Sequence, residues 1–172
     1  MIGLSATTGL AFDVTSTDIK PGHKMSSQHE LSGFGYTGGN ISPQLAWSNP
    51  PEGTESFAVF VHDEDAASGG AGFWHWVVID IPADVTALDS GAGSEGGSIP
   101  AGARQMATDF GVPGWGGPCP PVGDGDHNYS FTVYALPVSA LEVPDEATAS
   151  LTGFVVNSIA LGSTTLKAKY NR

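Results

Sequence analysis

Two aspartates, two histidines and a tyrosine stand at the ends of segments that are otherwise apolar or alternate between apolar and polar residues. Residues two apart in an extended chain share one side, so Asp63 and Asp65 leave the preceding segment together, and His127 shares a side with Tyr129. His75 interrupts an apolar segment. Imidazole, phenol and carboxylate groups can hydrogen-bond a ligand or transfer a proton. Because binding groups concentrate where strands meet loops, the pattern indicates a binding or acid–base site.

The loop 115–121 reads Trp-Gly-Gly-Pro-Cys-Pro-Pro and is the most unusual string in the chain. Its glycines would let main-chain N–H groups approach a ligand, and its prolines would hold the loop in one shape. Main-chain N–H groups can bind an anion without a cationic side chain. This suits a chain whose only arginines are Arg104 and Arg172.

Two other motif matches do not carry a function. Residues 91–96 satisfy the pattern G-x-G-x-x-G, but no strand precedes them and no helix follows, so a flexible loop is favoured over a nucleotide site. Residues 63–74 resemble a calcium loop only at the start, because the twelfth position holds Trp74 instead of glutamate. We therefore expect no resident metal and no cofactor.

The composition limits the class of protein. The 172 residues suit one domain, spanning 1–172. Acidic residues outnumber basic ones 18 to 6, for a formal charge of −12, which argues against nucleic acid and anionic membrane surfaces as partners. No run of 18 apolar residues occurs, so we expect no integral membrane association. The single cysteine, Cys119, excludes an internal disulfide and a multi-cysteine zinc site.

The first eight residues bear on localisation. They contain neither a basic stretch nor a long apolar one, so no signal peptide is recognised and a cytoplasmic location is expected. If a leader was removed before this numbering begins, the location would instead be periplasmic or extracellular.

Strands dominate the predicted secondary structure. Alternating or continuously apolar segments predict strands at 11–16, 41–48, 57–61, 73–81, 127–136 and 165–170. Segment 57–61 is apolar on both sides, as in a strand buried on both faces. In segment 73–81, simple alternation places Trp74, Trp76 and Val78 on one face. Leu151, Phe154, Val155 and Ile159 lie at helical spacing and predict a helix over 147–161.

A family resemblance runs from about residue 12 to residue 170. The motifs that carry it, in order, are Gly38-Gly39-Asn40-Ile41-Ser42-Pro43, Pro51-Glu52-Gly53-Thr54, Asp63-Glu64-Asp65, His75-Trp76, Asp109-Phe110-Gly111, Gly116-Gly117-Pro118-Cys119-Pro120-Pro121 and His127-Asn128-Tyr129. With them the chain resembles the phosphatidylethanolamine-binding protein family, in its bacterial and archaeal Raf-kinase-inhibitor-like branch. The resemblance implies two antiparallel sheets in a Greek-key β-sandwich with a few short peripheral helices.

The resemblance also implies a small pocket for phosphate or a phospholipid headgroup. Its implied lining is Asp63, His75, His127, Tyr129 and the backbone of Gly117 and Pro118. Asp65 is implied to orient its neighbours, and Phe73 is implied to form one wall of the pocket. In this interpretation His75 and His127 both donate hydrogen bonds to phosphate oxygens, and Tyr129 adds a hydroxyl.

The chain departs from the family pattern at three places near this pocket. The usual D-P-D-A-P reads Asp63-Glu64-Asp65-Ala66-Ala67, so both prolines are lost. The usual H-R-Y has Asn128 at its centre, which removes a positive charge. Tyr36 stands where this branch often has a cysteine. The first two departures bear on ligand affinity and preference, whereas the expected fold is unaffected.

Three functions fit these observations. The leading hypothesis is a preformed pocket that binds phosphate, phosphoethanolamine or a phospholipid headgroup, with a regulatory role left open. The second is a weak carboxylesterase-like hydrolase with His75, His127 and Asp63 as catalytic candidates, which would need a metal-activated water because the pocket motifs offer no serine. The third is a kinase or protease inhibitor-like module. The sequence names no protein partner and leaves a homodimer open.

Overall fold

The apolar segments at 57–61 and 73–81 lie in two neighbouring inner strands of a five-stranded sheet. The computed structural model describes residues 9–172. Neighbouring strands are antiparallel, in the order β10-β9-β5-β6-β8. These strands are β5 (Ser56–Asp63), β6 (Phe73–Pro82), β8 (Arg104–Gln105), β9 (His127–Leu136) and β10 (Gly162–Tyr170). The segment 1–8, on which the expectation about a leader rests, lies outside the described residues.

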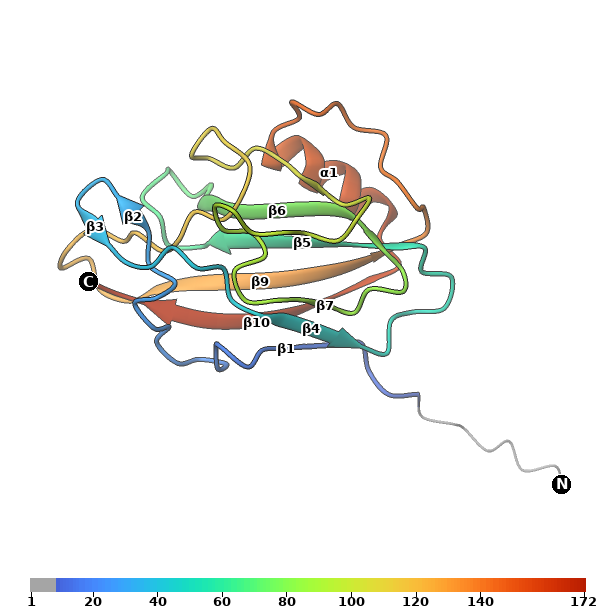
Figure 1. Cartoon of the computed structure of the whole chain (residues 1–172), viewed down its shortest axis with the longest axis horizontal. Coiled ribbons are helices and arrows are strands. Elements are labelled where there is room, and N and C mark those ends of the chain that lie inside the picture. Colours follow the sequence, from blue (N-terminus) through green and yellow to red (C-terminus); the bar gives the residue numbers. More distant parts are fainter. Residues whose placement is uncertain (1–8) are drawn as a thin grey trace, which may run out of the picture.

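A three-stranded antiparallel sheet, in the order β1-β4-β7, packs against one face of the larger sheet (Figure 1). Its strands are β1 (Asp13–Thr15), β4 (Leu45–Ser48) and β7 (Ala87–Leu88), and a separate hairpin pairs β2 (Ser32–Gly33) with β3 (Tyr36–Thr37). The mainly β, antiparallel character is confirmed. The expectation of two sheets is wrong, because the short β2–β3 hairpin forms a third. The Greek-key connection stays a prediction.

The apolar core lies on both faces of the five-stranded sheet. Phe57, Val59 and Val61 of β5 face the three-stranded sheet, whereas Ala58 and Phe60 face the helix α1 (Ala149–Ile159). This is why β5 is apolar at every position, since both of its faces are covered. Within residues 9–172 no helix is long and apolar enough to cross a membrane.

The helix α1 is the one helix among the described residues, where the resemblance implies a few. It packs on the sheet through its small side chains, Ala149, Thr152, Gly153 and Val156. A Cβ at Gly153 would lie 3.5 Å from the Phe60 ring, so the helix approaches the sheet closely. Leu151 is 47% exposed and Phe154 is 74% exposed. The predicted helix is confirmed, and Val155 and Ile159 of its expected apolar face do pack against the core. Leu151 and Phe154 do not, because small residues fit this close contact.

A β-bulge at His75 changes which side chains face the site. Residues of β5 pair with Trp74 and with Trp76, and none pairs with His75, which is therefore the extra residue of the bulge. Trp76 lies in the core between the sheets, whereas Trp74 packs with Val77 on the side of α1. The expected common face of Trp74 and Trp76 is therefore wrong, because the bulge reverses the alternation. His75 is directed to the end of the sheet beside Phe73.

Candidate ligand pocket

A cavity of about 230 Å³ opens at the sheet edge where β5 ends and β6 and β9 begin. Because these neighbouring strands are antiparallel, residues far apart in sequence meet there. The lining residues are Asp63, Ala66, Ala67, Phe73, His75, Cys119, Pro120, Pro121 and His127. Of the residues assigned to a site from the sequence, the structure thus brings Asp63, Phe73, His75 and His127 to one cavity.

The Asp63 carboxylate is buried and held by two hydrogen bonds. Its Oδ1 accepts the backbone N–H of Asp65 at 2.9 Å, in a turn that aspartate forms readily after a strand. Its Oδ2 accepts the Nδ1–H of His127 at 2.7 Å, and both side chains are about 5% exposed or less. Asp63 is therefore fixed in position by the local chain on one side and by β9 on the other.

His127 carries a positive charge in this arrangement. Its Nδ1 lies 2.7 Å from Asp63 Oδ2, and its Nε2 lies 3.0 Å from Asp124 Oδ2. Ionised carboxylates only accept hydrogen bonds, so both ring nitrogens must carry protons. Burial alone lowers the pKa of His127, but the hydrogen bonds and charges of Asp63 and Asp124 outweigh it and raise the pKa. The sequence interpretation missed Asp124, which lies in an irregular loop where spacing carries no signal.

His75 is neutral and presents a lone pair. Its Nδ1 lies 2.7 Å from the carbonyl oxygen of Gly116, and because a carbonyl only accepts, Nδ1 carries the proton. Burial, partly offset by this hydrogen bond and by Asp63, lowers the pKa of His75 to about 4. In the neutral ring Nε2 is then an acceptor. In this neutral form His75 accepts a hydrogen bond, whereas the sequence interpretation has it donating one to a phosphate oxygen; that donor role stays a prediction.

Aromatic rings enclose His75 and account for its burial. Its ring centroid lies 5.2 Å from that of Phe73, 5.4 Å from that of Phe110 and 5.3 Å from that of Tyr129. The contacts with Phe110 and Tyr129 are edge-on, a favourable arrangement for aromatic pairs. These rings exclude water from His75, and this desolvation keeps the imidazole uncharged.

Tyr129 is fully buried, and its hydroxyl makes no hydrogen bond to any described residue. It stands opposite Asp63 in the register of β9 and β5. Burial and then the Asp63 charge raise the pKa of Tyr129, so its hydroxyl stays protonated. Tyr129 is absent from the cavity lining but touches His75, which lines it. A buried hydroxyl without a partner is costly, which makes it a candidate for contact with a ligand or an ordered water.

The glycines of the loop 115–121 serve close packing and do not expose amides to the cavity. The Gly117 N–H donates to Asn40 Oδ1 at 2.8 Å, and Pro118 has no N–H and accepts from Leu31 N through its carbonyl. A Cβ at Gly117 would lie 2.1 Å from the carbonyl oxygen of His29. The expected anion-binding role of the Gly117 and Pro118 backbone is therefore wrong, because the neighbouring segment occupies these groups.

Asp65 lies outside the cavity and fixes the start of β9. Its Oδ2 accepts the backbone N–H of Asn128 at 2.7 Å and the side-chain amide of Asn128 at 2.8 Å. The same two hydrogen bonds lower the pKa of Asp65. Asn128, which stands where the family pattern has arginine, thus ties the loop after β5 to β9. The orienting role implied for Asp65 stays a prediction.

The sequence profile of the phosphatidylethanolamine-binding protein family matches residues 15–171. The chain belongs to the phosphatidylethanolamine-binding protein family. It is similar to the UPF0098 protein YbcL of Escherichia coli K12, with 46% identity over 161 residues covering 93% of this chain and 87% of YbcL. It is 42% identical over 156 residues to YbhB of the same organism, covering 91% of this chain and 98% of YbhB.

The crystal structure of E. coli YbcL superimposes with a TM-score of 0.89 at 45% sequence identity, covering 94% of this chain and 98% of YbcL. A homologue of the family from Chlamydia trachomatis gives a TM-score of 0.78 at 24% identity, covering 94% of this chain and 98% of that one, and so shares the fold. The chain therefore has the fold of these relatives.

The pocket offers few groups for catalysis by a hydroxyl nucleophile or by a bound metal ion. The cavity lining contains no serine or threonine. Among residues 9–172, no group of three or more His, Cys, Asp or Glu side chains is arranged to hold a metal ion. The metal set of Asp63, His75 and His127 considered from the sequence does not fit, because carboxylates engage both ring nitrogens of His127.

The Cys119 thiol is expected to react slowly with electrophiles, although it lines the cavity. Burial, and then the Asp63 charge, raises its pKa to about 11. Relative to an ordinary thiol, this reduces the thiolate fraction at neutral pH about 100-fold. Mass spectrometry of iodoacetamide-treated protein measures the rate, with urea-unfolded protein as the control. Equal rates for folded and unfolded protein would contradict the prediction.

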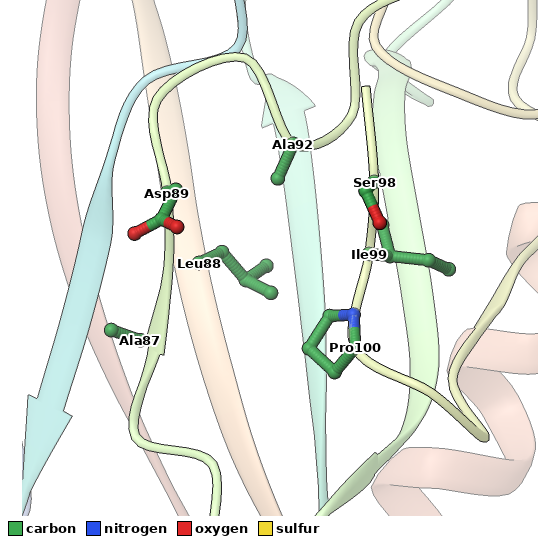
Figure 2. A pocket seen from close by; sticks show the side chains of 7 residues that line it. All are labelled: Ala87, Leu88, Asp89, Ala92, Ser98, Ile99 and Pro100. Atoms are coloured by element: carbon green, nitrogen blue, oxygen red, sulfur yellow. The ribbon is translucent and has the colours of Figure 1, made fainter. Parts of the chain in front are cut away.

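A different cavity of about 310 Å³ lies beside the edge strand β7 (Figure 2). It is lined by Ala87, Leu88, Asp89, Ala92, Ser98, Ile99 and Pro100. Asp89 is the one ionisable residue of this set, and Leu88, Ile99 and Pro100 supply apolar surface. This cavity lacks the convergent polar groups of the pocket at Asp63 and His127, and it does not compete with it as the candidate site.

Proposed function

We propose that this protein binds a small anionic ligand that also carries a hydrogen-bond donor, such as monoprotonated phosphate or phosphoethanolamine. The observation that carries the proposal is the placement of a buried imidazolium, His127, beside a neutral acceptor, His75 Nε2, at one cavity. A ligand with negative oxygens satisfies the first group, and a ligand O–H or N–H satisfies the second.

The remaining groups support the same ligand chemistry. The unpartnered Tyr129 hydroxyl supplies a donor next to His75, and Asp63 supplies negative charge that favours a ligand ammonium or hydroxyl. No lysine or arginine of the described chain lines the cavity, so the positive charge among its lining residues is that of His127. A zwitterion or a partly protonated phosphate therefore matches the pocket better than a fully ionised anion.

The size of the cavity favours a headgroup. Its volume of about 230 Å³ lies below the ~300–1,000 Å³ typical of sites for drug-sized molecules. Phosphate and phosphoethanolamine are small enough for such a space. If the natural ligand is a phospholipid, the headgroup occupies the cavity and the remainder lies outside it.

Replacing Tyr129 with phenylalanine is expected to weaken binding without weakening the fold. A hydrogen bond to a charged group contributes about 1.5–3 kcal/mol, so the dissociation constant for phosphoethanolamine should rise about tenfold or more. The free energy of unfolding should stay equal or increase slightly, because the lost hydroxyl has no protein partner. Histidine-detected NMR titration and urea unfolding measure the two quantities.

Tyr134→Phe is the matched control, because Tyr134 lies on the same strand and packs on the side of α1. It should leave the dissociation constant unchanged. Phosphate, phosphoethanolamine and ethanolamine are titrated separately to identify which part of the ligand binds. If no ligand shifts the His75 or His127 resonances up to millimolar concentration, the proposed function is wrong.

A further inference from the structure

His127 lines the cavity but has no hydrogen available for an anion. Its Nδ1–H is directed to Asp63 and its Nε2–H to Asp124. If a ligand anion binds this imidazolium as proposed above, one of the two carboxylates must leave. The inference that follows rests on that proposed function.

The two carboxylates are held very differently. The Asp63 side chain is 5% exposed and also accepts the Asp65 N–H, so its departure would break two hydrogen bonds in a buried place. The Asp124 side chain is 48% exposed, and within the described chain its carboxylate has one hydrogen-bond partner, His127. Water can solvate the Asp124 carboxylate when it leaves, whereas Asp63 would lose its partners without such compensation.

The backbone around Asp124 permits this movement. Gly123 and Gly125 flank Asp124 with φ values of 82° and 90°, in the left-handed region that glycine adopts without strain. Both lie in a loop without regular secondary structure between the proline-rich segment and β9. The Asp124 side chain can therefore turn towards solvent through a change confined to a few residues.

We infer that Asp124 is an internal competitor that occupies the anion position on His127 Nε2 until a phosphate oxygen displaces it. With Asp124 in place, the cluster of Asp63, Asp124 and His127 has a net charge of −1, which repels anions. After displacement, the phosphate oxygen accepts the Nε2–H and the charge of the remaining pair is balanced. Asp124 thereby selects ligands that bind His127 more strongly than a carboxylate does.

Asp124→Asn tests this role, with Asp126→Asn as the matched control. Both variants remove one negative charge from the same loop, but Asp126 faces Lys169, 3.6 Å away, and Asn171. An amide oxygen is a weaker acceptor than a carboxylate, so Asp124→Asn should lower the dissociation constant of inorganic phosphate about tenfold. Asp126→Asn should change it by about twofold or less, as expected for a charge screened by solvent. Isothermal titration calorimetry measures both.

A second readout follows the carboxylate directly. In the wild-type protein, phosphate should shift the side-chain ¹³C resonance of Asp124 towards that of a solvent-exposed aspartate, and the resonance of Asp126 should not move. If phosphate binds without shifting the Asp124 resonance, Asp124 is not displaced and the inference is wrong.

The possible outcomes separate this inference from the proposed function. If both variants gain affinity equally, the effect is one of general charge, and the competitor role is refuted while the pocket stands. If Asp124→Asn binds phosphate more weakly than the wild type or equally well, Asp124 does not compete, and again only the inference fails. If neither the wild type nor any variant binds phosphate, the proposed function fails and the inference fails with it.

Discussion

Replacing Asp63 with asparagine is expected to lower the free energy of unfolding by about 3 kcal/mol at neutral pH. The substitution removes the buried carboxylate that faces Nδ1 of the His127 imidazolium, and it weakens the turn to Asp65. Removal of one member of a buried ion pair typically costs about 3–5 kcal/mol, and the lower end applies here because Asp124 still faces His127. Urea unfolding followed by circular dichroism measures the change.

Asp124→Asn is the control for this prediction, because it removes the half-exposed carboxylate that faces Nε2 of the same imidazole. Asp124 is half exposed, so its loss should cost less than about 1 kcal/mol. Equal losses for the two variants would show that burial does not distinguish the two carboxylates. That outcome would contradict both the stability prediction and the reason for which Asp124, and not Asp63, is expected to leave.

Acidification is expected to destabilise the protein through His75. The pKa of His75 is about 4 in the folded protein and about 6.5 in an unfolded chain, so between these values the unfolded state binds more protons. The contribution of neutral His75 to the free energy of unfolding is therefore fully present above pH 6.5 and is lost as the pH decreases towards 4. A difference of about 2.5 pKa units corresponds to about 3 kcal/mol.

His127 contributes with the opposite sign. Its pKa is raised in the folded protein, so its contribution is present below the unfolded pKa and is lost as the pH rises through the folded value. The two histidines are separated by comparing the wild type with His75→Gln from pH 7 to pH 4. The wild type should lose about 3 kcal/mol more than the variant over this range.

His23→Gln, which replaces an exposed histidine outside the pocket, should follow the wild type. If the variant at position 75 is too unstable to measure, NMR titration of the His75 ring in the wild type replaces it. A ring that gains its proton near pH 6.5 would show that the imidazole is not desolvated, and the prediction would be wrong.

Local patterning was sufficient for most strands and for the residues at the edge of the sheet. The alternation over 127–136 matches β9, and the apolar segment 57–61 lies within β5, because burial on one face or both leaves a direct record in the sequence. The helix was found for the same reason. Its packing face was predicted only in part, since Val155 and Ile159 pack on the core but the close approach of α1 to Phe60 depends on Gly153 and on a neighbour far away in the chain.

The candidate site was predictable in part of its residues but not in their protonation. The order of the motifs correctly predicted that Asp63, His75 and His127 lie together, since each lies near a strand end on the same sheet edge. The direction of each hydrogen bond depends on partners that spacing does not reveal. Gly116 makes His75 an acceptor, and Asn40 occupies the Gly117 amide that was expected to bind an anion.

Composition and motif order predicted the family, the β-rich architecture and four of the residues that line the cavity, Asp63, Phe73, His75 and His127, because these depend on residue type and on contacts along single strands. The three-dimensional arrangement was needed for the bulge at His75, the charge on His127 and the presence of Asp124 at Nε2. These features arise where segments distant in sequence contact one another in the buried interior. Desolvation and hydrogen-bond partners there determine which groups carry protons.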